Sequence, residues 1–321
     1  MRAIQVSENG GPEVLRYAEV ADPQPGPGEL LVRTEAIGVN FIDTYIRIGR
    51  YPTALPYIPG AEGSGVVTAV GSGVTEFTLG DRVAWADAKG SYAEQVVVNA
   101  AAAIPVPAGV SPAVAASALL QGMTAHYLIE SIYRPERGET VLVHAGAGGV
   151  GLILTQLAVA RGVRVITTVS TDEKAALSRE AGAAEVLRYD DDLAERVRAL
   201  TDGIGVAAVY DGVGAATFEA SLAALRVRGM LALFGAASGP VPPFDLQRLN
   251  GAGSLFVTRP KLGDYTRDRN ELLWRAGDVL AAIADESLRI RIGATYPLAE
   301  AEQAHRDLEG RKTTGSIVLL P

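Results

Sequence analysis

Short apolar runs separated by glycine and proline dominate the first third of the chain. Strand-like runs rich in Val, Ile and Leu lie at 30–37, 65–71, 81–85 and 92–98. Six prolines between positions 23 and 59 argue against long helices in this part. The pattern predicts a small barrel-like β unit with long loops.

The pattern changes after Pro112. Residues 113–127 are rich in Ala and Leu and predict a helix. Strands and helices then alternate: we expect strands at 140–144, 164–169, 185–189, 206–210 and 230–234, and helices at 152–161, 174–181, 193–200 and 218–225. This alternation is typical of a doubly wound parallel sheet with right-handed crossovers.

The last sixty residues differ from both preceding parts. Helices are expected at 270–283 and 299–308, and strands at 288–292 and 316–320. The terminal strand is expected to return to the first unit.

Composition excludes several kinds of site. The 321 residues contain no cysteine, which rules out a disulfide scaffold, Cys-ligated zinc or iron–sulfur sites and a cysteine nucleophile. The net charge of −8 argues against nucleic-acid binding as the main purpose. The chain starts without an apolar signal segment, and the uncharged stretch 140–160 contains four glycines, so we expect a cytoplasmic protein without a membrane partner.

One glycine motif points to a cofactor. Residues Gly146–Gly151 fit the pattern G-x-G-x-x-G, directly after an apolar strand and before a predicted helix. In that context the glycines let the backbone approach a pyrophosphate at the helix N-terminus. The alternative is that they only form a tight strand–helix turn.

The end of the second strand favours NADP over NAD. NAD sites usually place an acidic residue there, but this strand ends in Ser170 and Thr171. Lys174 follows and suits a 2′-phosphate. Asp172 or Glu173 turned inward would reverse this preference; alternatively, Asp172 caps a helix and Lys174 is solvated.

Several motifs together resemble the zinc-independent, zeta-crystallin-like quinone oxidoreductases of the medium-chain dehydrogenase/reductase superfamily. They lie at 39–47, 60–67, 80–83, 145–151, 210–214 and 256–260, with Arg311 near the end. The resemblance implies an α/β fold with a GroES-like β-barrel catalytic domain (1–121 and 262–321) and a Rossmann domain (122–261). It also implies a homodimer, with a strand near 229–235 or 255–258 pairing across a two-fold axis.

The resemblance also predicts metal-free chemistry. The superfamily's zinc enzymes typically hold their catalytic metal with Cys, His and Cys. In this sequence Asn40, Ala61 and, roughly, Gln121 stand at those positions. Only three histidines occur, and they are scattered.

Four polar residues are candidates to line the acceptor site: Asn40, Asp43, Tyr45 and Tyr51. The two tyrosines have hydroxyls that suit a quinone oxygen. The alternative for Asn40 and Asp43 is loop capping, and for the tyrosines ordinary packing. By resemblance, the expected cofactor contacts are Phe41, Ile42, Thr44, Met123, Thr124, Tyr127, Gly148, Gly149, Val150, Ser170, Lys174, Tyr189, Gly212, Val213, Phe234, Gly235, Ala236, Phe256, Val257, Thr258 and Arg311.

Three functions compete at this point. The first is NADPH-dependent reduction of a quinone. The second is reduction of conjugated alkenes or enones by the same fold. The third is an NADPH-binding protein with little turnover that serves as an RNA-binding or structural protein, against which the acidic balance counts.

Overall fold

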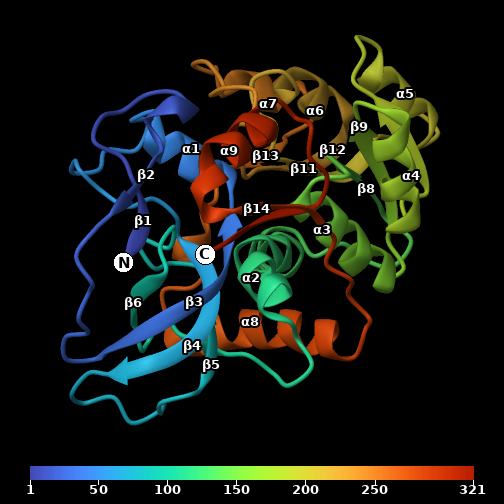
Figure 1. Cartoon of the computed structure of the whole chain (residues 1–321). Helices are drawn as coiled ribbons and strands as arrows, with labels where there is room; N and C mark the ends of the chain where they lie inside the picture. The colour runs from blue at the N-terminus through green and yellow to red at the C-terminus, as the bar shows by residue number, and fades with distance from the viewer. The chain divides into compact units, whose positions relative to one another are not determined.

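The computed structural model describes all residues from Met1 to Pro321. The chain divides into two compact units (Figure 1). The first comprises Met1–Met123 and Thr266–Pro321, and the second Thr124–Tyr265. The domain boundaries expected from the sequence fall a few residues earlier, at 121/122 and 261/262.

The first unit is built mainly on antiparallel strands. A seven-stranded sheet has the order β14-β15-β3-β4-β5-β7, with β6 paired to β3, and a small sheet joins β1 and β2. The strands are β1 (Arg2–Gln5), β2 (Arg16–Glu19), β3 (Glu29–Val39), β4 (Glu62–Val70), β5 (Arg82–Trp85), β6 (Gln95–Asn99), β7 (Ile104–Pro105), β14 (Ile292–Pro297) and β15 (Ser316–Leu320).

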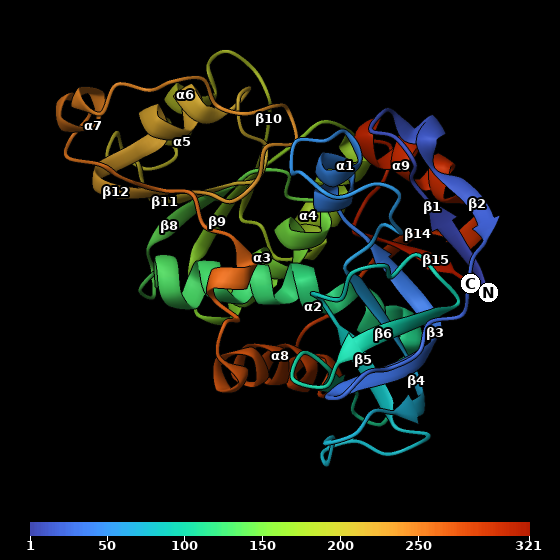
Figure 2. The same ribbon diagram turned by 90° about the vertical axis from the view of Figure 1, so that its left-hand side faces the viewer.

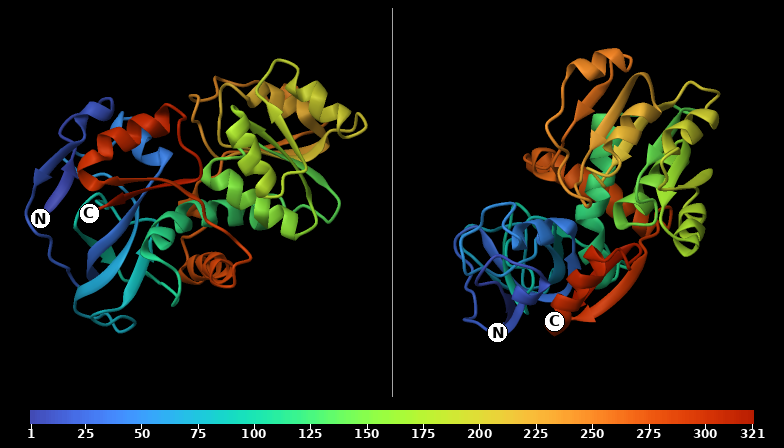
Figure 3. Two further views of the ribbon diagram at one scale, coloured as in Figure 1. Left: turned by 45° about the vertical axis from the view of Figure 1, so that its right-hand side comes forward. Right: turned by 90° about the horizontal axis from the view of Figure 1, so that it is seen from above.

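The long strand β3 organises this unit. Leu30 and Val32 on it are fully buried and pack with Trp85 in one apolar cluster. The C-terminal strand β15 pairs antiparallel with the far end of β3, so the return of the last strand to the first unit is confirmed. Both termini therefore lie in the first unit, near each other (Figure 3).

Helices of the first unit include one short element that the sequence pattern did not predict. They are α1 (Phe41–Arg47), most of α2 (Pro112–Tyr127), α8 (Arg269–Ala284) and α9 (Ala301–Glu309). The strand predicted at 288–292 is wrong. Leu288 instead packs behind the end of α8, with its N–H donated to the carbonyl of Ala282 at 2.8 Å, and the strand β14 begins only at Ile292.

The second unit is a six-stranded, fully parallel sheet with the order β10-β9-β8-β11-β12-β13. This is the Rossmann order, with the switch point between β8 and β11. Its strands are β8 (Thr140–Val143), β9 (Arg164–Val169), β10 (Glu185–Arg188), β11 (Val206–Asp211), β12 (Leu225–Leu233) and β13 (Phe256–Thr258).

Helices cover both faces of this parallel sheet. The helices α5 and α6 pack together on one face, and α3 packs with α4 on the other (Figure 2). The helices that follow the strands of this unit are α3 (Gly149–Ala160), α4 (Asp172–Glu180), α5 (Leu193–Ala199), α6 (Phe218–Ala224) and the short α7 (Gln247–Gly251). Apolar strands such as β8 are buried because both faces are covered.

No helix in either unit has both the length and the apolar character needed to cross a bilayer. The uncharged stretch 140–160 is divided between β8, the glycine turn and α3.

Candidate active site

The glycine turn between β8 and α3 presents free N–H groups. The first intrahelical bond of α3 runs from Leu152 N to Gly148 O, at 2.9 Å. The N–H groups of Gly149, Val150 and Gly151 precede it, so they have no intrahelical acceptor and are available to an anion. The helix dipole adds positive potential at the same point.

Two other glycines of the motif shape the turn. A Cβ on Gly151 would lie 2.3 Å from the carbonyl oxygen of Ala145, and one on Gly146 would lie 2.6 Å from Cβ of Thr167. Both contacts are too short for any side chain. The turn therefore requires glycine at these positions, as the glycine turns that bind pyrophosphates in Rossmann folds do.

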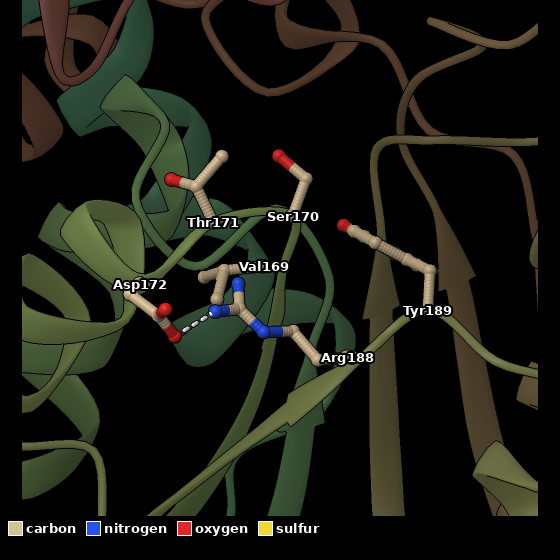
Figure 4. A pocket seen from close by; sticks show the side chains of 6 residues that line it. All are labelled: Val169, Ser170, Thr171, Asp172, Arg188 and Tyr189. Carbon is tan, nitrogen blue, oxygen red and sulfur yellow. Dashed lines mark hydrogen bonds and ion pairs between the residues drawn. The ribbon is translucent and has the colours of Figure 1, made fainter.

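A pocket of about 500 Å³ opens beside this turn, at the ends of β9 and β10 (Figure 4). It is lined by Val169, Ser170, Thr171, Asp172, Arg188 and Tyr189. The Tyr189 hydroxyl oxygen accepts a hydrogen bond from Ala145 N at 2.8 Å, which ties the pocket to the glycine turn. Lys174 lies in the first turn of α4, where its N–H donates to the Thr171 cap at 3.2 Å.

Arg188 is a charged pocket residue that was not predicted from the sequence. Asp172 does line the pocket, but its carboxylate is paired with the Arg188 guanidinium (Figure 4). The acid that would favour NAD is therefore matched by a cation. A basic residue ending the third parallel strand was the available signal.

The turns that follow β11 and β12 lie at the same end of the parallel sheet as the glycine turn. A Cβ on Gly235 would lie 2.3 Å from the carbonyl oxygen of Gly212, so the two turns touch through their backbones. The predicted contacts Gly212, Val213, Phe234, Gly235 and Ala236 therefore lie together at one edge of the sheet. Ligands bind at this edge in open parallel sheets.

The remaining expected cofactor contacts do not lie at these strand ends. Tyr127 is 1% exposed and stacks on Tyr265 with ring centroids 4.5 Å apart, and Thr124 is also buried. Phe256 and Val257 lie on the edge strand β13 and are 55% and 37% exposed. Met123 and Arg311 belong to the first unit.

In the first unit, Asn40 directly follows β3 and caps the start of α1, and its side chain is held on both sides. Its Nδ2 donates to Glu62 Oε2 at 2.7 Å, and its Oδ1 accepts from Gln121 Nε2 at 3.2 Å. Leu120 N donates to the other oxygen of Glu62 at 2.7 Å, and Ser316 Oγ donates to Gln121 Oε1 at 2.8 Å. Asn40 is thus fixed in orientation by three other elements.

These contacts do not fit a zinc ion at the superfamily's metal position. The side-chain amides of Asn40 and Gln121 are hydrogen-bonded to each other, and the side chain of Ala61 has no atom that can ligate a metal. No cluster of three or more His, Asp or Glu side chains is arranged to hold a metal. Glu62 is the one carboxylate here, and both of its oxygens accept hydrogen bonds from N–H groups.

Asp43 lies in the first turn of α1 and is only 1% exposed. Its Oδ2 accepts from Asn40 N at 2.9 Å and from the Tyr92 hydroxyl at 3.1 Å. Behind Tyr92 lie His305 Nε2, at 2.9 Å from its hydroxyl, and Arg47, whose guanidinium is 2.7 Å from His305 Nδ1. Asp43 therefore positions α1 and Asn40, as loop capping would, and its carboxylate is enclosed by protein.

Burial shifts the pKa values of two carboxyl groups and one histidine in this region. Desolvation raises the pKa of Asp43 to about 7 and that of Glu62 to about 8. Desolvation, together with the Arg47 charge, lowers the pKa of His305 to about 3. His305 is therefore neutral, and since Arg47 donates to its Nδ1, its Nε2–H donates to Tyr92.

The raised carboxyl pKa values predict a stability that falls with pH. In the unfolded chain these groups ionise at about pH 4, so between about pH 4 and 8 the folded chain binds more protons than the unfolded chain. Neutral His305 has the opposite effect below about pH 6.5, because a histidine in the unfolded chain is protonated there. The free energy of unfolding should therefore fall by a few kcal/mol mainly between about pH 6.5 and 8. Urea unfolding at several pH values measures this.

Asp43→Asn is the control for that pH dependence. It keeps an oxygen for Asn40 N and Tyr92 but removes one titrating group, so the slope of stability against pH between about pH 5 and 7 should become less negative than in the wild type. A wild-type stability that rises between about pH 6.5 and 8, or an unchanged slope in the variant, would contradict the assignment.

An aromatic surface follows Asn40 on α1 and the next loop. Tyr45 lies 6.3 Å from both Phe41 and Tyr51, measured between ring centroids. Tyr51 is 43% exposed, whereas Tyr45 is 9% exposed. The guanidinium of Arg50, which the sequence pattern also missed, lies over the Tyr45 ring at 4.5 Å. This surface suits a flat, conjugated molecule.

A Rossmann sheet with a glycine turn between its first strand and helix, together with a β-rich unit, is the architecture of the medium-chain dehydrogenase/reductase class. Residues 26–108 match the alcohol dehydrogenase GroES-like domain family, and residues 149–267 match the zinc-binding dehydrogenase family. These matches confirm the predicted fold class.

Comparison with whole proteins narrows this class. The chain is 47% identical to the quinone oxidoreductase of Pseudomonas aeruginosa, over all of this chain and 99% of that one. It is 60% identical to mycobacterial Rv1454c, whose structure complexed with NADPH superposes with a TM-score of 0.98 and full coverage of both chains. It is also 41% identical to a Burkholderia 2-haloacrylate reductase, covering 99% of this chain and 98% of that one. The chain belongs to the quinone oxidoreductase family of this superfamily.

Proposed function

We propose that this chain is an NADPH-dependent quinone reductase that uses no protein-bound metal. The observation that carries the proposal is the direct bond between Ala145 N and Tyr189, which joins a pyrophosphate-binding turn to a pocket containing Arg188. A dinucleotide with a phosphorylated adenosine ribose matches both parts. The NADPH complex of the 60% identical mycobacterial protein supports this assignment.

Each part of the chain has a distinct task in this proposal. NADPH, when bound, supplies a hydride. The N–H groups of Gly149 and Val150 bind the pyrophosphate, and Ser170, Lys174 and Arg188 bind the 2′-phosphate. Tyr45 and Tyr51 line the quinone site, with their hydroxyls offered to a quinone oxygen. Asn40 presents a fixed amide, and Asp43 acts as a positioning residue beneath it.

Quinones suit a site of this composition. Reduction places negative charge on an oxygen, which hydrogen-bond donors can stabilise. A quinone accepts electrons readily, so the need for a Lewis acid is smaller than for a simple ketone. The hydrogen bond between the Asn40 and Gln121 amides, where the zinc enzymes have metal ligands, is consistent with reduction that needs no Lewis acid.

Reduction of a conjugated acid is the second candidate. The specific observation is Arg50, which is exposed and has no carboxylate partner, beside the aromatic surface. A guanidinium there suits an anionic substrate. The 41% identical relative is named for such a substrate, 2-haloacrylate.

Turnover with a panel of acceptors tests the two candidates. NADPH oxidation is measured with neutral quinones, neutral enones and 2-haloacrylate, and kcat/KM is compared. We expect the quinones to give the highest values. A higher value for 2-haloacrylate, lost in Arg50→Met, would replace quinone reduction by the second candidate.

We also propose a cytoplasmic homodimer. The sheet of the second unit ends at β13, whose outer edge has no partner strand and carries exposed Phe256 and Val257. Pairing of two such edges across a two-fold axis buries this apolar surface. Sedimentation at the mass of a single chain would contradict it.

A further inference from the structure

A continuous buried chain of hydrogen bonds crosses the second unit beneath the expected cofactor site. It consists of Thr168, His144, Ser221 and Asp211, each 0–1% exposed. His144 Nδ1 lies 2.8 Å from Thr168 Oγ1, and His144 Nε2 lies 3.0 Å from Ser221 Oγ. Ser221 Oγ donates to Asp211 Oδ2 at 2.8 Å. We call these four residues the strand-end chain.

The donor and the acceptor of each hydrogen bond in the strand-end chain can be assigned by starting from the Asp211 carboxylate. The Asp211 carboxylate only accepts, so the single hydroxyl proton of Ser221 points to it. Ser221 must then accept from His144 Nε2–H. A neutral imidazole has one N–H, so Nδ1 accepts from the Thr168 hydroxyl. A neutral His144 is therefore fixed in the Nε2–H tautomer.

Three adjacent strands meet in this chain. Thr168 lies near the end of β9, His144 directly follows β8, and Asp211 ends β11. Each is followed by a segment that carries expected cofactor contacts: Ser170, the glycine turn, and Gly212 with Val213. The order β9-β8-β11 in the sheet makes these segments neighbours.

Further hydrogen bonds, most of them to backbone N–H groups, connect the strand-end chain to those segments. Asp211 Oδ1 accepts from Val213 N at 2.8 Å and Gly214 N at 3.0 Å, and its Oδ2 also accepts from Thr217 Oγ1 at 2.7 Å. On the other side, Thr168 O accepts from Gly146 N at 2.9 Å. The side-chain network thus connects the turn after β11 to the glycine turn after β8.

We propose that the strand-end chain is the positioning device of the dinucleotide site, with Ser221 and His144 holding three cofactor-binding segments in one fixed arrangement. This inference rests on the proposed use of NADPH. None of the four side chains needs to touch the cofactor; they act through the turns. Burial lowers the pKa of His144, an effect opposed by the Asp211 charge, which agrees with the neutral imidazole.

Two substitutions break the strand-end chain, and each has a matched control. Ser221→Ala removes the hydroxyl between His144 and Asp211, and Thr168→Val removes the donor to His144 with little change of shape. Two other hydroxyls bond away from this network: Ser91 Oγ donates to Ala88 O at 2.8 Å, and Thr201 Oγ1 donates to Val197 O at 2.9 Å. Ser91→Ala and Thr201→Val therefore remove a hydroxyl hydrogen bond without cutting the strand-end chain or touching the glycine turn.

NADPH affinity, measured by fluorescence titration without an acceptor, separates these variants. We expect Kd to rise about tenfold in Ser221→Ala and about threefold in Thr168→Val, and to change less than about twofold in both controls. In steady-state assays the KM for NADPH should rise, whereas kcat at saturating NADPH should stay the same. Thermal unfolding is recorded for all four, because each loses a hydroxyl hydrogen bond.

Equal Kd values in the chain-breaking variants and their controls would overturn the inference, and so would an Nδ1–H tautomer of His144. With three histidines in the sequence, ¹⁵N spectra can be assigned directly, and His144 should remain the neutral Nε2–H form across about pH 6–8. A wild-type chain that does not bind NADPH would instead overturn the proposed function, and this inference with it.

Discussion

Replacing Gly149 by valine should abolish NADPH binding while leaving the chain folded. Gly149 is the first residue of α3, so its backbone has a helical conformation that residues with side chains also adopt. Valine is the better helix former, so stability should not fall. Its side chain, however, occupies the space where a pyrophosphate must approach the free N–H groups. We expect Kd for NADPH to rise at least about 100-fold, or about 2.7 kcal/mol.

Gly277→Val provides the matched control for Gly149→Val. Gly277 lies within α8 in the other unit, is exposed, and has no atom within 4 Å of an added Cβ. This variant should bind NADPH as the wild type does. Unchanged affinity in Gly149→Val, measured by the same titration, would remove the glycine turn from the site.

The second large effect concerns the choice between NADPH and NADH. Lys174→Ala should raise KM for NADPH about 10- to 100-fold, which is the value of one lost charge-assisted bond to a phosphate. NADH has no 2′-phosphate, so its KM should stay nearly constant. Steady-state kinetics with both cofactors measure the ratio. Arg188→Ala should act in the same direction, and it also releases Asp172 from its ion pair.

Arg179→Ala is the comparison for Lys174→Ala, because it removes an exposed cation from the same helix. It should change neither KM. Equal effects of Lys174→Ala on both cofactors would mean that Lys174 does not bind the 2′-phosphate. Preference for NADH in the wild type would assign the pocket to Asp172 instead.

The second unit could be predicted well from sequence because its signals are local. Strands such as β9 coincide with apolar runs of the right length, and the glycine motif falls between a strand and a helix, as expected. The strand proposed at 288–292 failed because alternation does not show where pairing begins, and the first residue paired with a neighbouring strand is Ile292. There Leu288 is buried while its neighbour Arg289 is exposed.

The supporting contacts of the site could not be predicted from local patterns. Tyr92 lies 49 residues from Asp43 and 213 residues from His305 along the chain, yet it bonds to both. Glu62 was part of a recognised motif, but its role in orienting Asn40 depends on folding of β4 against β3. Arg188 is likewise an ordinary strand residue until the fold places it opposite Asp172.

Turnover in protein of known metal content tests the central claim most directly. Zinc is measured by mass spectrometry after dialysis against a chelator, and NADPH oxidation by a quinone is then assayed on the same sample. The account predicts full activity with far less than one zinc per chain. One zinc per chain, or activity lost on chelation and restored by added Zn²⁺, would contradict it.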